Sequence, residues 1–474
     1  MTEQDVLQVQ DLVLRTPAGE IEQKQSAWRA ALAAEYPGAN ERRQALIAEL
    51  LAENAVDLRS VLADWRLKCH REHAPGETCV ADASLAELAA GNLGLLRQWG
   101  RADLAEPAEA EIASIAASNL TKLARMTLRG EANTYWGNDY ASHLRRAMRR
   151  GACLVTTNPV LVNTARKEEP QYWVQVRDDL RAAHPGFSPA ELAYALTIQV
   201  VVGNARLLRP IWELSSGRLG YVSLQLSPEC ATDSEKMISE ALWVYDQLAE
   251  ALGGTPNTVF KVPGTAAGLD VAAELTSRGL GVNITVNFSL PQEIAFAAVI
   301  EKHSTAPVSF RTFMDGRLDD PVGDEMKEAG VSDWELVKQW CTTLVRQREY
   351  RLISKAPRAG GMGCAKAFPL PAAGRGPWNI LRSIHREPEA GMFITIFPNR
   401  QEQFDEEPRE INPEGMWDQA PEGYRDKLWK SKLFRQAYEP DGMRVEEFET
   451  FVPSVRTLTQ FCSEYQDFLG WVNG

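Results

Sequence analysis

The stretch from residue 259 to residue 288, VFKVPGTAAGLDVAAELTSRGLGVNITVNF, decides the fold of this chain. It opens with a short apolar run, Val259–Pro263, and closes with a second one, Val282–Phe288. A longer helical stretch lies between them. A short apolar run, a helix and another short apolar run predict two parallel strands that are joined by a crossover helix.

The same alternation recurs along most of the chain from about residue 126 onward. Eight units of strand and helix predict a closed (β/α)8 barrel of the α/β class rather than an open sheet. In such a barrel the chemistry lies at the carboxyl ends of the strands and in the loops that follow them. The further apolar runs are Leu154–Asn158, Tyr221–Leu226, Val308–Phe313, Tyr350–Lys355 and Met392–Phe397, with an eighth strand expected before Asp139, near Leu123–Leu128.

The chain divides into a helical region and a barrel. Residues 1–125 space Leu and Ala at three- and four-residue intervals, which predicts an N-terminal helical region. Residues 126–474 carry the barrel and two insertions. Residues 359–390, rich in Gly and Pro, predict a long loop after the seventh strand, over the active-site mouth, where Lys366 and Arg375 could reach a phosphate or be solvated. Residues 399–425 are acidic and punctuated by Pro.

Composition narrows the classes of function. The 474 residues are 44% apolar and 24% charged, which is typical of a globular protein with a large core. The 51 basic and 64 acidic residues give a net charge of −13, which argues against nucleic acid as the main partner. No apolar run approaches the roughly 18 residues of a membrane span, and we expect no secretory signal. The seven scattered cysteines fit reduced thiols, so we expect a cytoplasmic protein.

Lys261 is the most informative residue of the chain. It interrupts an apolar run that a parallel barrel strand should bury, and lysine is almost never buried without a partner. Burial disfavours the ammonium form, lowers its pKa and leaves an amine that can form a Schiff base with a ketone or aldehyde. A lysine that reaches the strand end or pairs with a carboxylate is the structural alternative.

Polar residues at the ends of other predicted strands strengthen the catalytic interpretation. Asn283 and Thr285 stand two residues apart and so share one strand face. A barrel interior gathers such groups in one place, where each needs a partner. Strand caps and turn formers are the alternative interpretation for Asn, Thr and Asp. The other polar residues of this kind are Thr156 and Asn158 in TTNP, Gln225 at the end of YVSLQL, and Asp139 in TYWGNDY.

The ordered set of motifs resembles the transaldolase family of class I, Schiff-base aldolases. The resemblance implies a β/α barrel of the class I aldolase type and no cofactor. It also implies transfer of a dihydroxyacetone unit between a phosphorylated ketose and a phosphorylated aldose, as in pentose phosphate metabolism. The similarity runs from about Asp139 to Phe397 through GACLVTTNP (151–159), GYVSLQLSP (220–228), VFKVPGTAAGLDVAAEL (259–275), GLGVNITVNFS (279–289) and DGRLDD (315–320).

The resemblance also implies roles for individual residues. Lys261 would form the Schiff base, and Asp139 would be the general acid and base. The two arginines, one after the sixth strand and one after the seventh, would grip the substrate phosphate through paired hydrogen bonds. The residues implied in catalysis are Lys261, Asp139, Gln225 and Thr285. Those implied in substrate binding are Asn158, Thr156, Asn283, Thr312, Arg317 and Arg358.

The pattern departs from the family at the third strand. Ordinary transaldolases have Glu at the position of Gln225, and glutamine can orient a water molecule but cannot titrate. The sugar-phosphate aldolase branch also has glutamine there, together with a tyrosine before the phosphate arginine. Phe313 and Met314 stand near that place here and lack a phenol. An aldolase that releases free dihydroxyacetone, and a barrel that binds a sugar phosphate without catalysis, therefore stay open, as does a homo-oligomer.

A second cluster, CHREHAPGETC (69–79), raises a zinc hypothesis. Cys69, His70, His73 and Cys79 are all metal-ligating types. Their spacing fits none of the usual zinc knuckles, and adjacent Cys69 and His70 point in different directions on a helix. We therefore expect no metal site, and we favour a helix end that carries two thiols.

Overall fold

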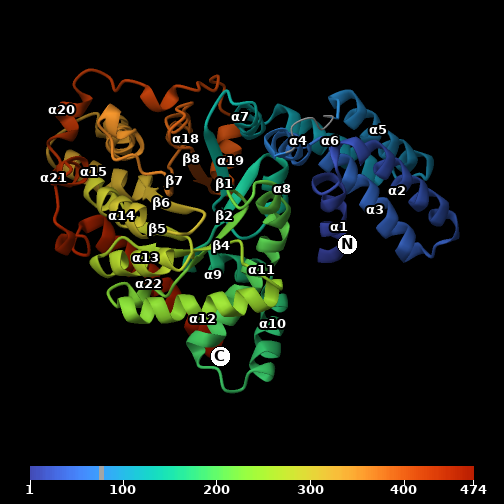
Figure 1. Ribbon diagram of the computed structural model, residues 1–474, viewed down its shortest axis with the longest axis horizontal. Helices are drawn as coiled ribbons and strands as arrows, with labels where there is room; N and C mark the ends of the chain where they lie inside the picture. The colour runs from blue at the N-terminus through green and yellow to red at the C-terminus, as the bar shows by residue number, and fades with distance from the viewer. Residues whose placement is uncertain (74–79) are drawn as a thin grey trace.

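The computed structural model describes residues 1–73 and 80–474, apart from the side chains of residues 67, 69–73, 159–162 and 165. The strands of this part of the chain are β1 (Thr134–Asn138), β2 (Ala152–Thr156), β3 (Tyr221–Gln225), β4 (Thr258–Pro263), β5 (Val282–Asn287), β6 (Ser309–Met314), β7 (Ala367–Ala372) and β8 (Met392–Ile396). They form one parallel sheet in the order β7-β6-β5-β4-β3-β2-β1-β8, and its two end strands lie in contact. The sheet is thus a nearly closed barrel with helices around it, which confirms the predicted (β/α)8 class (Figure 1).

Helices alone precede the barrel in the described residues. They are α1 (Glu3–Leu14), α2 (Ile21–Glu35), α3 (Glu41–Leu58), α4 (Val61–His73), α5 (Asp82–Gln98), α6 (Ala102–Ala117) and α7 (Asn119–Leu128). Figure 1 shows these helices, in blue, gathered on one side of the barrel. One cluster of buried apolar side chains includes residues of both parts, such as Leu51 and Val61 from the helices and Trp136 from β1. The N-terminal helices therefore pack on the barrel.

Crossover helices surround the strands and differ widely in length. Between the strands lie α8 (Leu144–Arg149), α9 (Pro159–Glu168), α10 (Pro170–Ala183), α11 (Pro189–Leu214), α12 (Ser234–Leu252), α13 (Ala266–Ser277), α14 (Leu290–His303), α15 (Asp315–Glu328), α16 (Trp334–Val337), α17 (Cys341–Glu349) and α18 (Pro377–Leu381). After β8 follow α19 (Pro398–Asp405), α20 (Tyr424–Leu428), α21 (Lys432–Tyr438) and α22 (Val452–Asn473). The long last helix returns to the barrel and contacts β5, α9, α11 and α15.

The first predicted strand is misplaced. Leu123–Leu128 lies in α7, which begins after Ser118, whose side chain accepts a hydrogen bond from the Thr121 amide. Leu120, Leu123, Ala124 and Leu128 are buried at helical spacing, so this apolar run is the packed face of a helix. The strand before Asp139 is instead the short TYWGN segment, whose Gly and Asn conceal its extended character.

The seventh predicted strand is also wrong. Tyr350–Lys355 continues α17 as a π-helical turn over Tyr350–Ser354, and buried Tyr350 and Ile353 supply its apolar character. The true seventh strand, β7, lies inside residues 359–390, which we expected to be a loop.

Two prolines conceal β7 in the sequence. The Ser309 amide of β6 donates to the Lys366 carbonyl, so the even-numbered residues of β7 bond to β6. Pro369 and Pro371 occupy odd positions, whose missing N–H groups would face β8. This explains why β7 and β8 lie side by side without a hydrogen-bonded ladder, since proline has no donor and is confined to the open edge of a strand.

A helix that spans a membrane must be both long and apolar. Among residues 1–73 and 80–474, none of the helices combines the length and the apolar character that a span requires.

Candidate active site

Lys261 lies inside the barrel on β4. Its side chain is 6% exposed, and its Nζ donates a hydrogen bond of 2.7 Å to the Thr157 carbonyl at the end of β2. Burial lowers the pKa of this ammonium group to about 8, with Asp139 opposing the shift and Arg317 adding to it. A buried lysine with a substantial neutral fraction near pH 7 is the form that attacks carbonyl carbons.

Asp139 lies directly after β1, close enough to Lys261 for its carboxylate to influence the lysine pKa. Thr156 at the end of β2 donates a hydrogen bond of 2.6 Å from its Oγ1 to Asp139 Oδ1. The Asp139 amide donates to the Ile396 carbonyl at the end of β8. The carboxylate is therefore held between the carboxyl ends of three adjacent strands, β8, β1 and β2.

The polar groups of β3, β4, β5 and β6 form one connected layer. Gln225 and Asn283 are the register partners of Lys261 on its two neighbouring strands. Asn283 Nδ2 donates to Ser223 Oγ at 3.0 Å, and Thr312 donates its hydroxyl to Asn283 Oδ1. All of these side chains except Gln225 are buried. The layer can hold the hydroxyl groups of a polyol beside the lysine.

Thr285 lies two residues beyond Asn283 and is the register partner of Pro263. Its hydroxyl reaches Met314 Sδ at 3.7 Å, and thioether sulfur is a weak acceptor. Thr285 therefore keeps most of its hydrogen-bonding capacity for another group.

Gln225 faces a small cavity beside the lysine. Its Oε1 atom is buried and has no hydrogen-bond partner in the described part of the chain. Asn158 lines the same cavity, together with Tyr194 from α11 and Tyr465 from α22. A buried carbonyl oxygen without a donor is the arrangement that binds a water molecule or a substrate hydroxyl.

Arg317 lies in the first turn of α15, after β6, as the sequence predicts. Its Nη1 donates to Gln460 Oε1 of α22 at 2.8 Å, and its guanidinium lies over the Phe461 ring. Burial lowers the pKa of Arg317, and the nearby positive charge of Arg375 lowers it further. A cation with a depressed pKa beside another cation favours an anionic ligand.

Arg358 is not near this site, and its assignment is wrong. Because β7 begins at Ala367, Arg358 precedes that strand and is exposed at the opposite end of the barrel from Lys261. Lys366 lies at the same end, where its Nζ donates to the Glu301 and Ser304 carbonyls. The misplaced seventh strand is the reason for this error.

The arginine that follows the true seventh strand is Arg375. Its Nε and Nη2 donate to Asp320 Oδ2 at 3.0 and 2.8 Å. A Cβ atom on Gly316 would lie 2.7 Å from the Ala373 carbonyl oxygen, so the absence of a side chain lets the start of α15 approach the backbone before Arg375. Arg375 lies in the segment expected as an insertion, where the sequence offers both Lys366 and Arg375 as residues that could reach a phosphate. The position of β7 separates the two, because Lys366 precedes that strand and Arg375 follows it.

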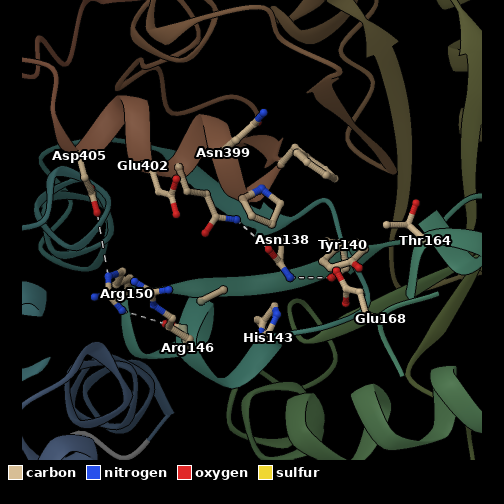
Figure 2. A pocket seen from close by; sticks show the side chains of 14 residues that line it. Asn138, Tyr140, His143, Arg146, Arg150, Thr164, Glu168, Asn399, Glu402 and Asp405 are labelled. Atoms are coloured by element: carbon tan, nitrogen blue, oxygen red, sulfur yellow. Dashed lines mark hydrogen bonds and ion pairs between the residues drawn. The ribbon is translucent and has the colours of Figure 1, made fainter. Parts of the chain in front are cut away.

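A cavity of about 400 Å³ lies outside the barrel wall, between α8 and α19 (Figure 2). Asn138 and Tyr140, the neighbours of Asp139, both line it. Asn138 Nδ2 donates to the Tyr140 carbonyl at 2.6 Å and to the Ser142 carbonyl, and its Oδ1 accepts from Gln401 Nε2 of α19. The loop that carries Asp139 is thereby fixed to α19.

Metal ligation has no support in the described residues, among which no group of three His, Cys, Asp or Glu side chains gathers. The side chains of Cys69, His70 and His73, and the whole of Cys79, lie outside the described part of the structure. The zinc hypothesis for that segment is therefore not tested by the structure.

Comparison with known proteins finds similarity over the middle of the chain. Residues 141–355 match the family model of Transaldolase/Fructose-6-phosphate aldolase. Transaldolase 1 of Streptomyces avermitilis is 31% identical over 197 residues, which cover 39% of this chain and 49% of that protein. A transaldolase of Neisseria meningitidis is 29% identical over 226 residues, which cover 43% of this chain and 61% of that protein.

A transaldolase of Thiobacillus denitrificans is 37% identical over 145 residues, which cover 30% of this chain and 37% of that protein. The chain thus spans about half the length of the curated relatives that it matches. The matched segment contains β2 to β6, with Lys261 and the polar layer around it. Over residues 141–355 the chain is therefore similar to the transaldolase/fructose-6-phosphate aldolase family.

Proposed function

We propose that this chain transfers a three-carbon dihydroxyacetone unit between phosphorylated sugars through a Schiff base on Lys261. The observation that carries the proposal is Lys261 itself, a buried lysine whose pKa is lowered to about 8 and whose neighbours are polar. Such an amine is a nucleophile for the ketone of a sugar.

The reaction begins when Lys261 Nζ attacks the C2 carbonyl carbon of the ketose. The carbinolamine that forms loses water and becomes a protonated imine. Asp139 then takes the proton of the C4 hydroxyl while the C3–C4 bond breaks, and the electron pair of that bond passes into the imine to give an enamine. The aldehyde fragment leaves at this point.

The second half of the reaction reverses these steps with a new aldose. The enamine carbon attacks the aldehyde carbon of the acceptor, and Asp139 returns its proton to the new hydroxyl. Water then hydrolyses the imine and frees Lys261. In this scheme Thr156 orients the Asp139 carboxylate, and Asn158, Asn283, Thr285 and Thr312 bind the hydroxyls of the sugar and of the carbinolamine.

A second candidate function is an aldolase that releases free dihydroxyacetone. Gln225 favours it, because a side chain that cannot titrate stands opposite Lys261 in register. Product analysis with the acceptor omitted separates the two: continued turnover supports the aldolase, and strict dependence on an acceptor supports the transferase.

Borohydride trapping with fructose 6-phosphate tests the shared chemistry. We expect a stable three-carbon adduct on Lys261, identified by peptide mass spectrometry. Sedoheptulose 7-phosphate and free dihydroxyacetone serve as further probes. Absence of an adduct with all three would contradict imine chemistry and leave a barrel that binds a sugar phosphate without catalysis.

The rate of imine formation should depend on pH in a way that reports the burial of Lys261. Only the neutral amine attacks, so the trapping rate should rise about tenfold from pH 7 to a plateau, with its midpoint near pH 8. The measurement is the initial rate of adduct formation with dihydroxyacetone across this range. A rate that still rises above about pH 10 would indicate an exposed lysine of ordinary pKa and would contradict the assignment.

Replacement of Arg375 with alanine should weaken binding of the phosphate and little else. Loss of a charge-assisted pair costs about 1.5–3 kcal/mol, and competition from Asp320 reduces the net loss, so KM for fructose 6-phosphate should rise about 10-fold. Imine trapping with unphosphorylated dihydroxyacetone should stay unchanged. The matched control is Arg358→Ala, an arginine at the other end of the barrel that should leave KM unaltered. Equal KM values for the two variants would refute the role of Arg375.

A further inference from the structure

The helix between β1 and β2 is too short to cover its strands. α8 has six residues, whereas α11 has 26 and α12 has 19. Strands of a parallel barrel need cover on their outer face. α4 contacts α8, and α7 contacts β1, so helices of the N-terminal region supply the missing cover.

Arginines of α8 and its C-cap point to acidic residues of that region. Arg145 and Arg149 both bind Asp57 of α3, at 2.7 and 2.8 Å, and both bind Glu53 of the same helix. The Asp57 side chain is fully buried. Burial alone would raise its pKa, but the two guanidinium groups hold that pKa below its usual value. The carboxylate therefore stays charged and paired.

A third arginine, at the C-cap of the short helix, binds another N-terminal helix. Arg150 donates to Glu111 Oε1 at 2.8 Å and to Ser114 Oγ at 2.9 Å, both on α6. The Arg150 carbonyl accepts a hydrogen bond from Trp136 Nε1 of β1. Removal of any of these acidic partners leaves arginines close together in the segment RRAMRR (145–150) with uncompensated charge.

The segment that these contacts fix leads directly to Asp139. Only residues 139–143 separate the end of β1 from α8. Figure 2 shows that Arg146 and Arg150 line the same cavity as Asn138 and Tyr140. The loop that carries Asp139 is therefore held at both of its ends. Gln401 of α19 holds Asn138 at one end, and the N-terminal region holds α8 at the other.

We propose that the N-terminal helical region positions the acid–base residue of this barrel, and that Asp57 is the positioning residue. Asp57 fixes α8 through Arg145 and Arg149, and α8 fixes the loop that presents Asp139. The inference rests on the proposed function, because it assigns Asp139 a task in C–C cleavage. Lys261 lies on β4, away from α8, so imine formation should not depend on Asp57.

The test separates the two steps in the variant Asp57→Asn. Turnover of fructose 6-phosphate should fall about 100-fold, because a small displacement of a catalytic group costs about that much. Borohydride trapping of dihydroxyacetone on Lys261, measured above about pH 9 where Lys261 is mostly neutral with or without the Asp139 charge nearby, should stay within about twofold of the unmodified protein. Amide hydrogen exchange in residues 139–150 should accelerate.

Two further variants complete the design. Glu53→Gln removes a partly exposed partner and should reduce cleavage by about tenfold in a protein that still folds, as checked by circular dichroism. Glu109→Gln, which breaks the surface pair with Arg97 inside the N-terminal region, is the matched control and should change neither step. Equal losses of trapping and cleavage in Asp57→Asn and Glu53→Gln, or unchanged cleavage in both, would overturn the proposal.

Failure of the proposed function and failure of the positioning role of Asp57 give different experimental results. If the unmodified protein forms no imine with dihydroxyacetone, the proposed function fails. In that case the exchange comparison between Asp57→Asn and Glu109→Gln still decides whether Asp57 holds residues 139–150. Unchanged exchange in Asp57→Asn refutes the positioning role whatever the activity.

Discussion

Replacement of Lys261 with methionine should abolish imine formation and reduce turnover by at least about 1,000-fold, because the nucleophile is removed. Borohydride trapping followed by peptide mass spectrometry should find no three-carbon adduct on any lysine. The measurement uses fructose 6-phosphate and dihydroxyacetone in parallel. An adduct of equal yield on another lysine of the variant would show that Lys261 is not the Schiff-base residue.

We expect the Lys261→Met variant to keep the fold of the unmodified protein. Methionine has a similar length, and it removes an ammonium group that burial disfavours. The free energy gained by removing a buried charge offsets the free energy lost with the hydrogen bond to the Thr157 carbonyl. We therefore expect a melting temperature close to that of the unmodified protein, so that loss of activity reports chemistry rather than unfolding.

Replacement of Asp139 with asparagine should separate the two chemical steps. General acid–base catalysis contributes about 100- to 10,000-fold, so turnover should fall by that factor while the imine on Lys261 still forms. Asparagine can accept the hydrogen bond from Thr156 but cannot take the proton of a hydroxyl. The expected result in mass spectrometry is an adduct of the uncleaved sugar, which the unmodified protein converts further.

The same variant has a second readout in its pH profile. The Asp139 carboxylate raises the pKa of Lys261, so its loss should move the midpoint of the trapping rate below about pH 8. Thr312→Ser, a conservative change in the polar layer away from the carboxylate, serves as the control for this shift. A midpoint that stays in place, or rises, would contradict the proximity of the two groups.

Much of the barrel could be predicted from the periodicity of the sequence. The runs that became β2 to β6 and β8 are short, apolar and flanked by helices, because both faces of these strands are buried. β1 and β7 were missed for opposite reasons. β1 contains Gly137 and Asn138, which lower its apolar content, and β7 contains two prolines that resemble loop punctuation.

Part of the polar layer around Lys261 was predictable because buried polar groups stand out in apolar strands. Lys261 and Asn283 needed no alignment of the strands to be noticed, whereas Thr312 was implied only by the family resemblance. The structure brings the three together. Ser223 was missed, although it lies two residues before Gln225 and therefore on the same strand face. Arg375 was a candidate from the sequence, but only the position of β7 distinguishes it from Lys366. The contacts between α3 and α8 join residues about 90 positions apart that no local pattern connects.

The pairing of Arg375 with Asp320 has a consequence for how the proposed site handles its substrate. A phosphate that binds the Arg375 guanidinium must displace the Asp320 carboxylate from it. Phosphate binding is therefore an exchange of one anion for another. The affinity gained is the difference between two ion pairs rather than the whole of one. When the sugar departs, Asp320 reoccupies the arginine and competes with rebinding, so such an exchange favours rapid turnover over tight retention of the product.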